Sequence, residues 1–326
     1  MIILTGGAGF IGSNVAADLN ETGRSDIVIV DSLGTDSKWR NIAKRRFDDI
    51  VFPDEVDVYL QGLAGADAVI HMGANSSTTA TDADEIVRSN FRLSVRLWNW
   101  CISTRTPFIY ASSAATYGDG SAGFVDDDSD AGMDMLKPLN LYGWSKHAFD
   151  RWALERARRH QAPPQWAGLK FFNVYGPNEG HKGDMKSLVA KNTPLILADK
   201  KISMFKSHKE GYADGEQLRD FIYVKDCTSV IGWLLGNRSV SGLFNLGTGK
   251  ARSFRELMLA IGIANGKSVD MEFIDMPASI RNQYQYFTEA KMEKLRSAGY
   301  SKPFYSLEEG VREYVQSYLM KTDQYR

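Results

Sequence analysis

Thr5-Gly6-Gly7-Ala8-Gly9-Phe10-Ile11-Gly12 is the stretch of sequence that decides the fold. It follows a short apolar run at residues 2–4, and its last three glycines have the Gly-x-Gly-x-x-Gly spacing found where a strand turns into a helix. Such a loop lets the backbone approach a pyrophosphate and directs unpaired N–H groups of the helix toward it. Asp31 ends the next predicted strand 19 residues after Gly12, where an acid would contact a ribose. We therefore expect a dinucleotide-binding sheet.

Short β-rich runs alternate with helical stretches over the first 110 residues, a pattern typical of parallel strands covered by helices on both faces. We predict strands at residues 2–4, 27–31, 68–71 and 108–112, and later strands of the same sheet at 168–172 and 242–246. One apolar stripe of a helix is predicted from residues that recur at spacings of three or four: Val87, Phe91, Val95, Trp98 and Ile102.

The fold class that these elements predict is α/β, a doubly wound parallel (Rossmann-type) sheet with a smaller C-terminal α/β substrate domain. We expect the dinucleotide-binding domain to comprise residues 1–172 and 222–249, and the substrate domain to comprise residues 173–221 and 250–326. A C-terminal helix could pack back on the first domain. Three stretches rich in Gly, Pro, His and charge are predicted to be loops over a ligand: 178–184, 207–217 and 277–283.

Composition excludes several classes of function. The 326 residues carry 39 basic and 40 acidic side chains, so no overall basic field favours nucleic acid or a membrane surface as a partner. Cys101 and Cys227 are too few and too far apart for a disulfide framework, and the five histidines show no metal-ligand spacing. We expect no metal, no signal peptide and no membrane span, and hence a soluble, cytoplasmic enzyme. His181 is expected to shape its loop.

Tyr142 and Lys146 lie four residues apart, which places a phenol and an ammonium on one face of a helix. A neighbouring cation is expected to lower the pKa of the phenol toward neutrality, so that Tyr142 could exchange a proton at pH 7. Ser113 follows the strand predicted at 108–112, and the carboxyl ends of such strands line the ligand crevice. Its hydroxyl could polarise a ketone, although a helix-capping serine would have the same position.

These motifs resemble the extended short-chain dehydrogenase/reductase superfamily, whose members share the glycine loop and the Tyr-x-x-x-Lys pair. Members that act on nucleotide sugars also carry stretches like those at residues 219–224 and 245–249. More narrowly, residues 71–79, 111–118 and 172–183 look like the ADP-heptose 6-epimerase family. Gly180-His181-Lys182-Gly183 is the most diagnostic element, and the likeness spans nearly the whole chain.

The resemblance implies an NADP-dependent isomerase that inverts C6 of an ADP-heptose, a precursor of the lipopolysaccharide inner core, and that assembles as a homo-oligomer, a pentamer. It implies catalytic roles for Ser113, Tyr142, Lys146 and Lys182. It places cofactor contacts on Gly6, Gly9, Phe10, Ile11, Gly12, Asp31, Ser32, Lys38, Met72, Gly73, Ala74, Asn75, Ser76, Asn90, Lys146 and Val174. It places substrate contacts on Ser113, Asn173, Asp184, Lys191, Phe205, Lys206, Ser207, His208, Arg219 and Tyr284.

Several alternatives stay open at this point. NAD could replace NADP, because Pro53 stands where some members have a second lysine near the adenosine phosphate. Lys182 could be an acid/base or a diphosphate ligand, and Arg219 could clamp a diphosphate or pair with Asp220. Another nucleotide-sugar epimerase or a dehydratase of the same superfamily is the alternative function. A cofactor-sensing regulator would keep the fold, but the retained Tyr142 and Lys146 speak against it.

Overall fold

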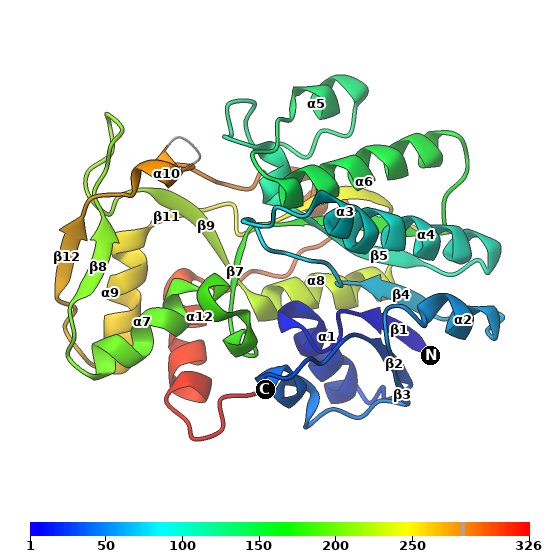
Figure 1. Cartoon of the computed structure of the whole chain (residues 1–326), viewed down its shortest axis with the longest axis horizontal. Coiled ribbons are helices and arrows are strands. Elements are labelled where there is room, and N and C mark those ends of the chain that lie inside the picture. Colours follow the sequence, from blue (N-terminus) through cyan, green and yellow to red (C-terminus); the bar gives the residue numbers. More distant parts are fainter. Residues whose placement is uncertain (282–283) are drawn as a thin grey trace.

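The computed structural model describes residues 1–281 and 284–326. Within these residues, seven parallel strands form a central sheet in the order β10-β6-β5-β4-β1-β2-β3 (Figure 1). The strands are β1 (Ile2–Thr5), β2 (Ile27–Val30), β3 (Asp49–Val51), β4 (Ala68–His71), β5 (Phe108–Ser113), β6 (Trp166–Phe171) and β10 (Gly242–Leu246). The strand order reverses between β1 and β4, which is where doubly wound sheets bind ligands. The predicted fold class is confirmed.

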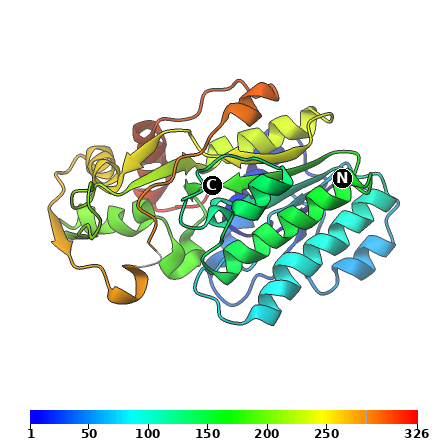
Figure 2. The same cartoon turned by 90° about the horizontal axis from the view of Figure 1, so that it is seen from above.

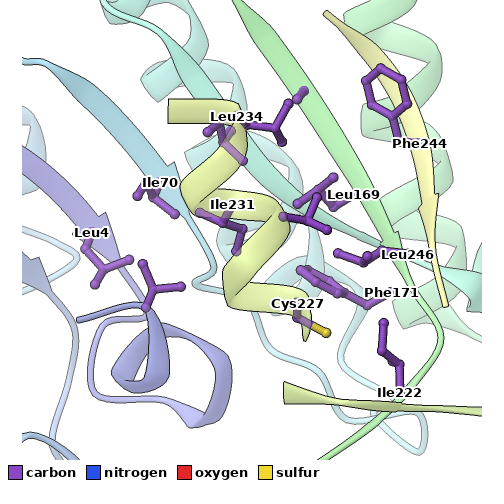
Figure 3. Packing of buried hydrophobic residues seen from close by; sticks show 14 of the residues in the cluster. Leu4, Ile70, Leu169, Phe171, Ile222, Cys227, Ile231, Leu234, Phe244 and Leu246 are labelled. Carbon is purple, nitrogen blue, oxygen red and sulfur yellow. The ribbon is translucent and has the colours of Figure 1, made fainter. Parts of the chain in front are cut away.

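Helices cover both faces of the sheet, as the two views show (Figures 1 and 2). Successive strand residues point to opposite faces, so Ile2 and Leu4 join one hydrophobic core and Ile3 joins the other. The first core is covered by α1 (Phe10–Glu21) and α8 (Val224–Gly236), and the second by α2 (Val56–Gln61), α4 (Leu93–Ser103) and α6 (Leu141–Arg158). Figure 3 shows Cys227 and Ile231 of α8 among the strand side chains of the first core.

The predicted helical stripe is only partly right. A π-helical turn at Val87–Arg92 joins the short helix α3 (Ala83–Ile86) to α4. A π-helical turn contains more residues than an α-helical turn, so the residues after it face a different direction from the one that a regular 3.6-residue repeat predicts. Trp98 is buried as expected, whereas Val87, Phe91, Val95 and Ile102 are half-buried, and the face that points into the core also includes Ile86, Leu93, Leu97 and Cys101.

The C-terminal part of the chain builds a smaller unit beside the sheet (Figure 1). Its strands are β7 (Asn173–Tyr175), β9 (Leu218–Tyr223) and β11 (Ala251–Ser253) in one sheet, and β8 (Ile202–Phe205) and β12 (Met271–Ile274) in another. A third core lies among α7 (Leu188–Leu197), α9 (Phe254–Asn265) and α12 (Leu307–Tyr314). The remaining short helices are α5 (Asp130–Met135), α10 (Ala278–Arg281) and α11 (Glu293–Ser297).

The domain division at residues 172, 222 and 249 stays a prediction. The helix α12 packs against α9 and β9, while Arg326 reaches α1 and forms ion pairs there with Asp18 and Glu21. The third predicted loop contains the short helix α10, and Asn282 and Gln283 of that loop lie outside the described residues. Among the residues that the structure describes, no helix has the length and apolar character needed to cross a membrane.

Candidate active site

A cavity of about 310 Å³ opens at the carboxyl ends of the central strands, beside the switch point between β1 and β4. The two strand ends are so close that a Cβ on Gly6 would lie 2.6 Å from the amide nitrogen of Gly73. The cavity is lined by Gly6, Gly9, Phe10, Ile11, Gly12, Asp31, Lys38, Met72, Gly73, Ala74, Ser76, Ala111, Ser112, Ser113, Tyr142, Lys146, Phe171, Phe172, Val174, His181 and Lys182. It therefore brings together most of the predicted cofactor residues and all four predicted catalytic residues.

The glycine loop has the shape that a dinucleotide pyrophosphate requires. Gly9 is the N-cap of α1 and has no side chain to satisfy the first N–H groups of the helix, which leaves them available to an anion. A Cβ on Gly12 would lie only 2.1 Å from the carbonyl oxygen of Gly6, so a larger residue would force the helix away from the loop. The residues present fit a bound nicotinamide dinucleotide.

Asp31 and Lys38 form an ion pair at the end of the cavity where the adenosine ribose is expected. The Nζ of Lys38 lies 2.6 Å from the Oδ1 of Asp31 and donates a hydrogen bond to the carbonyl oxygen of Ser32. The other carboxylate oxygen of Asp31 accepts a hydrogen bond from the backbone N–H of Ala8 at 2.9 Å. The carboxylate of Asp31, which was predicted to bind the ribose, is thus already paired with the ammonium of Lys38.

Three predicted cofactor residues, Ser32, Asn75 and Asn90, are absent from the described lining of this cavity. Asn90 is completely buried. Its side-chain oxygen accepts a hydrogen bond of 2.8 Å from the backbone N–H of Asn75, and its side-chain nitrogen donates one of 2.9 Å to the carbonyl oxygen of the same residue. The same amide donates to the hydroxyl of Ser145 on α6. Asn90 therefore positions the segment after β4, and Ser32 positions Lys38 through its backbone.

Tyr142, Lys146 and Ser113 meet at the inner end of the cavity. The N-terminal part of α6 carries Tyr142 and Lys146, and the Asn140 side chain caps this helix by accepting a hydrogen bond from the N–H of Gly143. Ser113 ends β5, and its hydroxyl accepts a hydrogen bond from the N–H of Ala115. Ser113 therefore caps a short helix and also lines the cavity, and its role toward a ketone stays a prediction.

The expectation that Lys146 lowers the pKa of Tyr142 does not agree with the structure. Burial raises the pKa of Tyr142 above its ordinary value, and a hydrogen bond with Ser113 lowers it only in part. Burial also lowers the pKa of Lys146 to about 8. Desolvation favours the neutral form of each side chain, and Lys146 is not among the groups that shift the pKa of Tyr142. The Nζ of Lys146 donates a hydrogen bond of 2.8 Å to the carbonyl oxygen of Ala111.

Lys182 lines the same cavity from the 3-10 helix Gly180–Met185, which lies outside the central sheet. Its Nζ lies 5.4 Å from the ring centroid of Phe10, and burial lowers its pKa. Among the described residues, no carboxylate lies within 4.0 Å of this amine. Next to it, the Nδ1 of His181 is 3.0 Å from the Nδ2 of Asn41, which also donates a hydrogen bond to the carbonyl oxygen of Ala8. The loop-shaping role of His181 stays a prediction, and His181 also lines the cavity, which the sequence analysis did not predict.

A second cavity of about 300 Å³ adjoins the first. It lies between β7, α7 and α9, and it shares Phe172, Val174 and Lys182 with the first cavity. Asn173, a predicted substrate residue, lines this second cavity. Lys182 therefore stands where the two cavities meet.

Apart from Ser113 and Asn173, the predicted substrate residues lie outside the described lining of both cavities. Arg219 lies over the rings of Tyr284 and Phe254, at 5.2 and 5.5 Å, and Tyr284 also packs against Phe205. Lys206, Ser207 and His208 continue from Phe205, while Lys191 is on α7 and Asp184 is exposed. The alternative in which Arg219 pairs with Asp220 is wrong, because the carboxylate of Asp220 accepts hydrogen bonds from Thr248, Gly249 and Ala290 instead.

A Rossmann-type sheet with a glycine loop, serine, tyrosine and lysine around one cavity has the architecture of an extended short-chain dehydrogenase/reductase. The chain belongs to the NAD dependent epimerase/dehydratase family, whose model matches residues 2–247. The family supports a nicotinamide nucleotide as cofactor.

The full-length relatives narrow the comparison. The chain is 52% identical to an ADP-L-glycero-D-manno-heptose-6-epimerase of Nitratidesulfovibrio vulgaris (strain DP4), over 99% of each chain. It is 49% identical to a protein of the same name from Fusobacterium nucleatum, over 100% of each chain. Among solved structures, the Helicobacter pylori enzyme of that name superposes with a TM-score of 0.78 at 28% identity, covering 97% of this chain and 95% of that one.

Proposed function

We propose that this protein is an ADP-heptose 6-epimerase, which converts ADP-D-glycero-D-manno-heptose to ADP-L-glycero-D-manno-heptose in the supply of lipopolysaccharide inner-core precursors. Relatives that carry this name are about half identical to the chain over its full length. The observation that carries the proposal is the position of Lys182, which faces the same cavity as Tyr142 and Ser113 and also borders a second cavity.

The chemistry requires a temporary oxidation. The carbon to be inverted is a side-chain carbinol without an adjacent carbonyl, so its C–H bond is not acidic enough for simple proton abstraction. When bound, a nicotinamide cofactor supplies the acceptor for the hydride of that carbon and then the donor that returns it to the other face of the planar ketone. The reaction has no net redox change, so the protein must retain both the cofactor and the ketone.

The side chains of the cavity have separate tasks in this proposal. Tyr142 accepts the proton of the substrate hydroxyl in its phenolate form, which is the minor form because burial raises the pKa of Tyr142. The hydroxyl of Ser113 donates a hydrogen bond to the oxygen as it becomes a carbonyl. Lys146, whose pKa is lowered to about 8 by burial, holds a proton beside Tyr142. Lys182 gives a proton to the oxygen when the ketone is reduced on its other face. Burial lowers the pKa of Lys182, which is the direction of shift that a general acid acting at neutral pH requires.

We further propose that the cofactor is NADP, with NAD as the alternative. In NAD-binding sheets the acid at the end of the second strand accepts hydrogen bonds from the ribose 2′-OH. Here Lys38 neutralises Asp31 and presents an ammonium at the same place, which favours a 2′-phosphate. Cytoplasmic location and assembly as a homo-oligomeric pentamer stay predictions.

Two measurements test the proposal. Purified protein is incubated with ADP-D-glycero-D-manno-heptose, and the configuration at C6 of the product is determined by NMR. Inversion at C6 supports the assignment, whereas turnover of UDP-galactose without conversion of the heptose would overturn it. The absorbance and mass of the nucleotide released on denaturation then distinguish NADP from NAD.

A further inference from the structure

A buried ion pair lies next to the catalytic face of α6. Asp150 follows Lys146 by four residues and Tyr142 by eight, so all three side chains lie on the same face of the helix. The Oδ2 of Asp150 is 2.8 Å from the Nζ of Lys170 on β6. The two side chains are 0% and 1% exposed, which makes them the most deeply buried of the ion pairs in the described residues.

Residues that precede and follow Ser113 in the sequence form hydrogen bonds with this ion pair. The hydroxyl of Ser112 donates to the Oδ2 of Asp150 at 2.7 Å, and the Nζ of Lys170 donates to the hydroxyl of Thr116 at 2.9 Å. Tyr110, earlier on β5, donates to the Oδ1 of Asp150 at 3.0 Å. The pair therefore ties α6, which carries Tyr142 and Lys146, to the segment that carries Ser113.

Stability alone is a poor reason to bury such a pair. Removing two charges from water costs several kcal/mol per ion, and apolar side chains of similar volume often give equal or greater stability. Apolar residues would not, however, fix the direction of α6 relative to Ser112 and Thr116, because dispersion contacts lack the directionality of hydrogen bonds.

We propose that Asp150 and Lys170 are positioning residues for the reaction, and that this buried pair sets the geometry and the electrostatic field of Tyr142 and Lys146 relative to Ser113. The inference rests on the proposed function for what the site does, but its geometry does not depend on which sugar is bound. Neither residue belongs to the described lining of the cavity, although Asp150 contacts Ser112, which does, so both residues act through other side chains.

Other groups contribute to the same field. The charge of Asp150 raises the pKa of Tyr142, in addition to burial, and opposes the burial that lowers the pKa of Lys146. Lys170 lies 5.2 Å from the ring centroid of Tyr117. The titratable groups that face the pair or Lys146 from the surrounding elements are Tyr110, Tyr117, Asp126, His147 and, from β4, His71.

Removing one charge at a time tests the proposal in the cofactor-loaded protein. Asp150→Asn deletes the negative charge and leaves Lys170, so the pKa of Tyr142 is expected to fall. Eight helical residues span about 12 Å, and at an effective dielectric constant of about 20 one charge at that distance shifts a pKa by about one unit. Lys170→Met leaves Asp150 unpaired, so the pKa of Tyr142 is expected to rise.

The pKa of Tyr142 is read from the tyrosinate absorbance of each variant minus that of the same variant carrying Tyr142→Phe. Lys225→Met is the matched control, because it breaks the half-buried Lys225–Glu313 pair far along the chain and is expected to leave Tyr142 unchanged. Shifts of opposite sign support the proposal. Shifts of the same sign, or no shift, would overturn it.

Kinetics give an independent measurement. The double variant Asp150→Asn/Lys170→Met leaves no unpaired charge and serves if a single variant does not fold. Its kcat is expected to fall at least tenfold with KM unchanged, and an unchanged kcat would overturn the proposal. The titration needs no sugar substrate, so a protein that fails to epimerise the ADP-heptose refutes the proposed function while the test of the ion pair still stands.

Discussion

Replacing Lys182 separates its two proposed roles. The amine has no carboxylate within 4.0 Å among the described residues, so Lys182→Met leaves no unpaired acid in the cavity and is expected to fold normally. The nearby Glu179 accepts hydrogen bonds from the N–H and hydroxyl of Ser187, which lower its pKa more than the charge of Lys182 does, so the loss of Lys182 removes only a smaller interaction. If Lys182 transfers a proton, its loss should lower kcat by about 10²- to 10⁴-fold, the usual contribution of a general acid or base.

A second substitution at the same position distinguishes proton transfer from diphosphate binding. Lys182→Arg keeps a cation for a diphosphate but cannot release its proton at neutral pH. An acid/base role therefore predicts that the methionine and arginine variants lose kcat alike, measured at saturating ADP-D-glycero-D-manno-heptose. Lys186→Met is the matched control, because Lys186 lines only the second cavity and not the one that holds Tyr142, so its loss should keep kcat. An unchanged kcat with a raised KM in Lys182→Met, restored by Lys182→Arg, would refute the acid/base role and leave a diphosphate ligand.

Three further outcomes are expected. Lys38→Met should weaken NADP binding at least tenfold while NAD binding changes little, as measured by calorimetry of the protein freed of nucleotide; equal weakening of both would contradict the role given to Lys38. Asn41→Ala removes the link between His181 and the carbonyl of Ala8, so the protein should lose its nucleotide faster during dialysis, and a wild-type rate would exclude this link as a constraint. Burial raises the pKa of Asp226 to about 7, above the value near 3.9 of an unfolded chain, so the folded state binds this proton more tightly and stability is lost as the pH rises through that window. Asp226→Asn should therefore unfold at a higher temperature than the wild type at pH 8 and at a similar temperature at pH 4, and equal unfolding temperatures at pH 8 would count against it.

Local sequence signals were sufficient to predict most strands of the central sheet and the residues that meet at the centre of the site. The loop at 5–12 and the Tyr142–Lys146 spacing are set by backbone geometry within one turn, so they can be read without tertiary information. β3 (Asp49–Val51) was missed, because three residues at a sheet edge give almost no periodic signal. The helical stripe was displaced because the π-helical turn at Val87–Arg92 follows no apolar repeat.

The electrostatics of the site could not be obtained from spacing. The predicted effect of Lys146 on Tyr142 considered one pair of charges, whereas burial sets the direction in which the pKa of each residue shifts. The pairing of Asp150 with Lys170 joins residues 20 positions apart on different elements. The only local hint was an acid one further turn along the helix that carries Tyr142.

The segment before Lys182 is joined to the amino-terminal part of the chain by four side-chain hydrogen bonds. Asn14 donates to the carbonyl oxygen of Pro177, and Asn178 donates to the hydroxyl of Ser13 and to the carbonyl oxygen of Asn41. The fourth joins the side chains of Asn41 and His181. Anyone who builds a chimera to alter sugar specificity, by grafting the loop of another epimerase onto this scaffold, would need to transplant matching partners from the amino-terminal part as well. A graft cut only at the boundary near residue 172 would leave these asparagines facing foreign neighbours.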